Sequence, residues 1–218
     1  MKILLVDPIG HALRPAGRRW FGPLCVMVGD CGTNMAMTGR HPRKPRPPLT
    51  AAKLEELAIF YVGRFATSRS KLLSYLKRKL RERGWEGDGE PNLEPLADRL
   101  VRLGYVDDRA FAVSKARSLT SRGYGERRVG QALALAGISE EEGADARSLA
   151  QDEAVSAALR FAKRRSIGPY AIKTPDPRER ERAIAAMVRA GHRFGLARAI
   201  VALEPGSEAD MEGLAEFC

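Results

Sequence analysis

Apolar residues recur at helical spacing from residue 50 onward, and three basic amphipathic runs share one layout. The runs are Lys71–Arg83, Glu126–Ala136 and Arg178–Ala190, and each is followed at once by a glycine. Glycine just past the last periodic residue is a common helix stop, because the left-handed conformation there favours it. These glycines, Gly84, Gly137 and Gly191, are 53 and 54 residues apart, and Leu80, Leu133 and Met187 each stand four residues before one of them. Spacing of this size is typical of stacked helical units.

Helix-start signals support the same division. Thr50, Ser68 or Ser70, Asn92 and Asp107 each stand where an N-cap is expected, and Asp176 precedes Pro177 with Glu179 three positions on, a near capping box. Further helices are expected over 154–163 and 193–203, with the weakest over 140–149. No alternating β pattern bounded by hairpin turns occurs. We therefore predict an all-α fold of three units with three helices each, over 50–104, 105–150 and 151–204, followed by an acidic tail at 205–218.

The first 49 residues do not follow this pattern. They hold eight basic and two acidic residues, and 41–48 (HPRKPRPP) is a basic, proline-rich stretch that cannot form a core element. The apolar run 20–28 is too short to cross a bilayer, and no signal-peptide cleavage site follows it. We expect 1–49 to be disordered. Our hypothesis is that translation starts at Met35 or Met37, and a peptide from 1–34 detected by mass spectrometry in the native organism would refute it.

The amino-acid composition indicates which class of partner the chain binds. The 218 residues are 44% hydrophobic and 29% charged, a globular balance, and the net charge is +10. So basic a chain suits a polyanionic partner, either nucleic acid or a nucleoprotein, rather than a membrane. The sparse, odd set of cysteines, Cys25, Cys31 and Cys218, argues against a disulfide framework and fits a reducing cytoplasm.

The run at 68–84 carries most of the candidate binding charge, with seven basic residues and one acidic residue. On a helical wheel Lys71, Lys77, Arg78 and Arg81 lie opposite a stripe formed by Leu72, Leu73, Leu76 and Leu80. A solvated helix face is the simple interpretation. The alternative is a surface for a polyanion or an acidic protein, because like charges at i,i+4 destabilise a helix unless an outside anion compensates them. Arg69 belongs to the same candidate surface.

The stretch 122–128 (RGYGERR) joins two predicted helices and has two equal interpretations. Its glycines allow a tight turn between the helices. Alternatively Arg122, Tyr124, Arg127 and Arg128 project from the corner toward a partner.

The sequence contains no motif that indicates catalysis or cofactor binding. No phosphate loop occurs, no serine or cysteine has a catalytic constellation around it, and the three histidines have no ligand at zinc spacing. Asp107 is explained as a cap, which leaves Asp108 without a metal-binding partner. Residues 131–139 imitate the first half of a helix-turn-helix, but Glu140, Glu141 and Glu142 would repel phosphate where the reading helix should begin. We predict no enzyme, no cofactor and no metal.

Several blocks together resemble the RecX family of recombinase regulators. They are SRSKLL at 68–73, GYVDDRAFA at 104–112, RGYGERR at 122–128 and LALAGI at 133–138. The resemblance covers about 50–204. The third unit departs from it at Gly191-His192, where the family tends to have Gly-Phe, and the acidic 139–149 stretch is unusual.

The resemblance implies three tandem three-helix repeats in an elongated, curved array. It further implies a non-enzymatic protein that binds RecA in the groove of the RecA–single-stranded DNA filament; we expect the chain itself to be a monomer. There it would restrain filament growth and lower RecA's ATPase, strand-exchange and LexA-coprotease activities. On this interpretation the basic residues named above meet acidic groove residues or exposed DNA. Two alternatives stay open: a helical protein that binds DNA without RecA, and an adaptor for another acidic protein.

Overall fold

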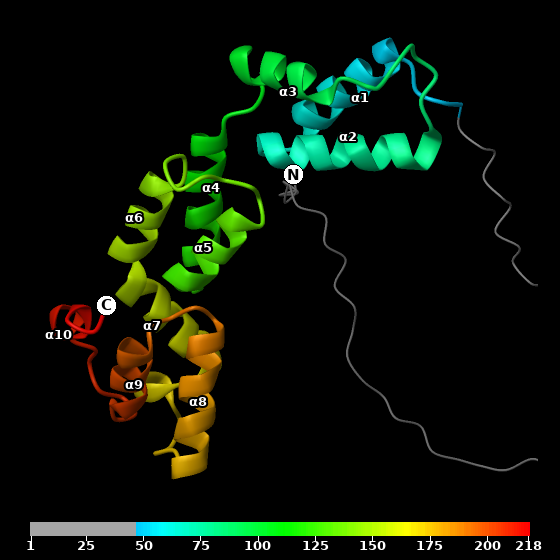
Figure 1. The fold of residues 1–218 in the computed structure, drawn as a ribbon. Helices are drawn as coiled ribbons and strands as arrows, with labels where there is room; N and C mark the ends of the chain where they lie inside the picture. Colours follow the sequence, from blue (N-terminus) through cyan, green and yellow to red (C-terminus); the bar gives the residue numbers. More distant parts are fainter. Residues whose placement is uncertain (1–46) are drawn as a thin grey trace, which may run out of the picture. The chain divides into compact units, whose positions relative to one another are not determined.

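A computed structural model describes residues 47–218, and every regular element in that part of the chain is a helix (Figure 1). An isolated bridge between Leu49 and Trp85 is the only β pairing among the described residues. The predicted all-α fold is confirmed. The calls on residues 1–46, including disorder and the start codon, lie outside the described residues. At the end of the segment expected to be disordered, Leu49 is instead fully buried in the first core, because it pairs with the backbone of Gly84 and Glu86.

The helices fall into three consecutive groups, coloured from cyan to red in Figure 1. The first contains α1 (Ala51–Arg64), α2 (Arg69–Arg83) and α3 (Leu93–Arg102). The second contains α4 (Asp108–Thr120), α5 (Glu126–Ala134) and α6 (Ala144–Asp152). The third contains α7 (Ala154–Arg165), the 3₁₀ turn η1 (Gly168–Tyr170), α8 (Pro177–Arg189), α9 (Phe194–Ala202) and α10 (Met211–Ala215).

Each group has its own hydrophobic core. Leucines dominate the first, among them Leu72, Leu76 and Leu100. The second relies on alanines packed around Val129 and Leu133. The third is the largest and includes residues on both sides of the predicted tail boundary, because Leu214 of α10 is buried in it. The acidic 205–218 segment therefore contains a docked helix, which its composition did not predict.

The predicted caps hold the helix starts. The side chains of Thr50, Ser68, Asp107 and Asp176 each accept a hydrogen bond from a backbone N–H three residues on, and Asp176 completes a capping box with Glu179. Asn92 precedes α3 but makes no such bond. The expectation for 140–149 needs correction, because α6 starts only at Ala144. Residues 140–143 form a turn in which Glu142 accepts hydrogen bonds from Ser139, so the carboxylates precede the helix.

The predicted stop glycines adopt positive φ angles, +82° at Gly84, +70° at Gly137 and +98° at Gly191. At the last two, the N–H of the next residue reaches back five positions, from Ile138 to Leu133 at 3.1 Å and from His192 to Met187 at 3.2 Å. This reach-back bond satisfies a carbonyl that the helix end would otherwise leave unpaired.

The ends of the middle helices of successive groups bond to one another. The start of α2 meets the end of α5, where the Ser68 hydroxyl donates to the Ala136 carbonyl at 2.6 Å, and beside it the Asp108 carboxylate at the start of α4 accepts from the Arg69 N–H at 2.8 Å. A Cβ at Gly137 would lie only 2.3 Å from the side chain of Ser70. We call this contact the α2–α5 joint.

The start of α5 meets the end of α8 in the same way. The N–H of Gly125 donates to the Ala190 carbonyl at 3.0 Å, and the N–H of Arg127 donates to the Gly191 carbonyl at 3.2 Å. A Cβ at Gly125 would stand 2.4 Å from the Gly191 oxygen. Gly123 and Gly125 are both buried here and form the turn between α4 and α5, while the role of the arginines toward a partner stays a prediction. We call this contact the α5–α8 joint.

His192 lies inside the α5–α8 joint. The ring is 2% exposed, sits edge-on to Phe161, and its Nε2 is 3.1 Å from the Gly123 carbonyl. The carbonyl fixes Nε2 as the donor, and Nδ1 has no hydrogen-bond partner among the described residues. Burial lowers the pKa of His192 to about 4.

A first prediction concerns close approach at the α5–α8 joint. Gly125→Ala places a methyl against backbone atoms that cannot move independently, and it should lower the free energy of unfolding by ~1–3 kcal/mol. Gly130→Ala is the matched control within α5, because nothing lies within 4 Å of its Cβ position. That change should instead stabilise by roughly 0.5–1 kcal/mol. Urea unfolding of both variants checks this, and equal stabilisation by both would contradict the joint.

A second prediction concerns pH. Because folded His192 has a pKa below the unfolded value, the unfolded chain binds more protons between these two values, and stability falls as the pH falls through that window. Relative to His192→Phe, the wild-type chain should lose about 2 kcal/mol between pH 7 and pH 5. Urea unfolding of the two proteins at both pH values measures the difference. Parallel loss of stability in both would show that His192 does not titrate as described.

Candidate partner-binding surface

Three of the predicted binding residues form one exposed row on α2. Lys77, Arg78 and Arg81 all lie on its solvent face. Lys77 and Arg81, one turn apart, have no ion-pair partner within residues 47–218, while Arg78 lies 3.6 Å from Glu82. A like-charge pair at i,i+4 opposes helix formation by ~0.2–0.5 kcal/mol, and an anion bound over it would remove that cost. We call these three residues the α2 cation row.

Aromatic rings border the α2 cation row. Tyr75 stacks on Tyr61 of α1 with ring centroids 4.1 Å apart, and the Arg78 guanidinium lies 5.6 Å from the Tyr75 centroid. Phe60, the residue before Tyr61 on α1, is 59% exposed, and its ring lies 5.6 Å from the Arg64 guanidinium. The α2 cation row therefore borders the stacked Tyr75–Tyr61 pair, and Phe60 adds an exposed ring on α1.

Arg69 is engaged within the protein. Its guanidinium donates to Asp98 at 2.8 Å and to Glu94 at 2.7 Å, both on α3, and its backbone N–H belongs to the α2–α5 joint. The hydrogen bond to Asp98 raises the pKa of Arg69. We conclude that this arginine ties α2 to α3 and presents little charge to a partner.

Lys71 is also turned toward the protein. Its ammonium lies 4.8 Å from the centroid of Phe111 on α4, and burial, followed by the nearby Lys115, lowers its pKa. The structure thus places Lys71 beside the α2–α5 joint and separates it from the α2 cation row, with which the helical wheel had grouped it.

The predicted binding residues of the 122–128 turn also include both exposed side chains and one that packs within the protein. Arg122, Arg127 and Arg128 are exposed. Tyr124 is half-buried and packs against both the second and third cores, with the Arg164 guanidinium 6.0 Å from its ring centroid. Tyr124 therefore contributes to packing between groups, whereas the three arginines remain available.

One cationic segment was missed in the sequence. Lys163, Arg164 and Arg165 end α7 on the exposed side, and Arg164 donates to the Arg122 carbonyl. Three consecutive basic residues were a readable signal, but nothing in the chain order indicates that they come beside Arg122. Arg164 therefore joins Arg122, Arg127 and Arg128 in a second basic surface at the α5–α8 joint, whereas Arg165 lines a hollow beside α8.

Asp107 and Asp108 hold the starts of two helices. Asp107 caps α4, as predicted, and Asp108 receives the start of α2, where burial raises its pKa. No group of histidine, cysteine and carboxylate side chains within 47–218 is arranged to hold a metal ion. Among the same residues, no helix is long and apolar enough to span a membrane.

Known proteins share this architecture. The family model described as RecX, second three-helix domain, matches residues 107–146. The regulatory protein RecX of Myxococcus xanthus strain DK1622 is 33% identical over 177 residues, covering 76% of this chain and 92% of the relative. That of Agrobacterium fabrum strain C58 is 27% identical over 150 residues, covering 67% and 80%.

Solved structures agree on the fold. The crystal structure of RecX from Lactobacillus salivarius aligns with a TM-score of 0.50 at 18% identity, covering 69% of this chain and 94% of that one. The helical groups and these relatives together define a helical regulatory protein. Within that class, the chain belongs to the RecX family.

Proposed function

We propose that this chain is a non-enzymatic regulator of homologous recombination and DNA repair that binds RecA and the RecA–single-stranded DNA filament. Binding restrains filament growth and lowers the ATPase, strand-exchange and LexA-coprotease activities of RecA, and so tempers the SOS response. Family membership supports the choice of partner, since the relatives carry the name regulatory protein RecX.

The α2 cation row is the observation that carries the proposal on this chain's own residues. Lys77 and Arg81 are exposed without an acidic partner in the described part of the chain, and Arg78 lies beside them. A nucleoprotein filament offers both DNA phosphates and acidic side chains, and long-range attraction to either increases the rate of encounter. Arg122, Arg127 and Arg128 of the 122–128 turn, with Arg164 of α7, supply further positive charge at the second basic surface.

A third prediction tests the α2 cation row. The triple variant Lys77→Glu, Arg78→Glu, Arg81→Glu should need at least about tenfold more protein than wild type to suppress RecA ATPase on single-stranded DNA, because like charges now oppose docking. Circular dichroism should show unchanged helicity, since all three side chains are exposed.

The matched control is Arg178→Glu, Arg180→Glu, Arg189→Glu on α8, three exposed arginines on another helix. It changes the net charge equally and should retain suppression. Undiminished inhibition by the α2 variant, or equal loss in both, would refute the assignment of the site.

Direct DNA binding without RecA is the second candidate. The exposed rings of Phe60 and Phe65, beside Arg64, favour it, because bases stack on aromatic faces while cations neutralise phosphates. Fluorescence anisotropy with labelled single-stranded DNA, without RecA, separates the two candidates. Binding that needs no filament, falls steeply with salt and is lost in Phe60→Ala, Phe65→Ala would establish this alternative.

A further inference from the structure

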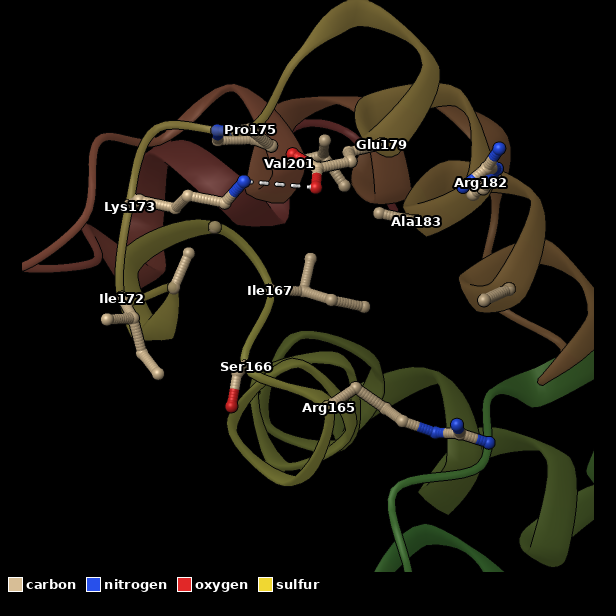
Figure 2. A pocket seen from close by; sticks show the side chains of 13 residues that line it. Arg165, Ser166, Ile167, Ile172, Lys173, Pro175, Glu179, Arg182, Ala183 and Val201 are labelled. Carbon is tan, nitrogen blue, oxygen red and sulfur yellow. Dashed lines mark hydrogen bonds and ion pairs between the residues drawn. The ribbon is translucent and has the colours of Figure 1, made fainter.

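The third helical group carries a groove that the RecA-directed surface does not use. It opens between the end of α7, the connection 166–176 and the face of α8, and encloses about 430 Å³. Figure 2 shows Ile167 and Ala183 reaching toward its centre from opposite walls. This volume lies within the ~300–1,000 Å³ that protein ligand sites occupy, and it accommodates one or two bulky side chains.

The wall of the groove is aliphatic. Ile167, Ala183 and Val201 line its interior, and Ile172 stands at its edge with 95% of its surface exposed. A bound partner would therefore cover apolar surface both inside the hollow and on Ile172 at its edge. No aromatic ring is among the lining residues, so the groove lacks the stacking platform that a nucleic-acid base requires.

The rim is cationic. Arg165 and Arg182 line it, both exposed and neither in an ion pair with any described residue. Lys173 pairs with Glu179 at 3.3 Å, and Glu179 also accepts the Asp176 N–H at 3.0 Å within the capping box. The single acid of the rim is thus already satisfied, while Arg165 and Arg182 retain their charge for a ligand.

We propose that this groove binds a peptide segment of a partner protein in which a bulky apolar side chain is flanked by carboxylates. The apolar side chain enters the hollow between Ile167 and Ala183, and the flanking acids meet Arg165 and Arg182. Apolar burial supplies affinity, and charge selects the partner and its orientation. The site is separate from the α2 cation row and does not depend on the proposed action on RecA.

Selection from a random displayed peptide library on the full chain tests this proposal. Enriched peptides should combine one large apolar residue with neighbouring Asp or Glu. Synthetic versions should bind at least about tenfold more weakly to Arg165→Glu, Arg182→Glu, and also to Ala183→Leu, which fills the hollow. The control Arg178→Glu, Arg180→Glu on the same helix should bind within about twofold of wild type, because neither arginine lines the groove.

Several results would overturn it: no enrichment, enriched peptides without carboxylates, or equal binding by the groove variants when circular dichroism shows all proteins folded. Displacement of the peptide by oligothymidylate at this groove would assign it to nucleic acid instead. Self-association that disappears in Arg165→Glu, Arg182→Glu would assign it to a second copy, whose acidic 204–218 segment has the complementary charge. The groove variants are also assayed for suppression of RecA ATPase. They should suppress it as the wild-type chain does, because the groove is separate from the α2 cation row.

Discussion

The fold depends on bonding between the ends of helices that belong to different groups. A helix start leaves N–H groups unpaired, and a helix end leaves carbonyls unpaired. In this chain the start of α5 donates to the carbonyls of Ala190 and Gly191, and Ser68 at the start of α2 donates to that of Ala136. The opposite partial charges of the two ends favour the same arrangement. Glycine is needed because the backbones approach too closely for a Cβ.

The joints also decide which cations remain available. Arg69 and Lys71 lie in the first turn of α2, next to the α2–α5 joint, and both turn toward neighbouring helices. Lys77 and Arg81 lie further along the same helix, where no described element covers them. Position along the helix, more than position around it, therefore separates structural from available charge. Tyr124 follows the same rule, since it stands next to glycines buried in the α5–α8 joint.

Local signals in the sequence were sufficient to predict where the helices begin and end. They were insufficient to predict which charged side chains are exposed together on the surface. A cap such as Asp107 or a stop such as Gly137 acts within a few residues, so its chemistry can be read directly from the chain. The role of Asp108 depends on Arg69, 39 positions away, and no periodicity encodes that pairing. For the same reason the wheel grouped Lys71 with Lys77. Helix α10 was not predicted, because only one side chain of this acidic segment, Leu214, is buried.

The two outer ends of this series of joints are closed by the chain itself. At one end, the Gly84 carbonyl that follows α2 accepts the N–H of Leu49 at 3.0 Å, and Leu49 is fully buried. At the other, the start of α8 is satisfied by the capping box of Asp176 and Glu179. A further copy could add to either end only by displacing these bonds. Repeat arrays generally need such closed ends to stay discrete. The surfaces left for a partner are therefore the sides of the helices, where the α2 cation row and the groove between α7 and α8 both lie.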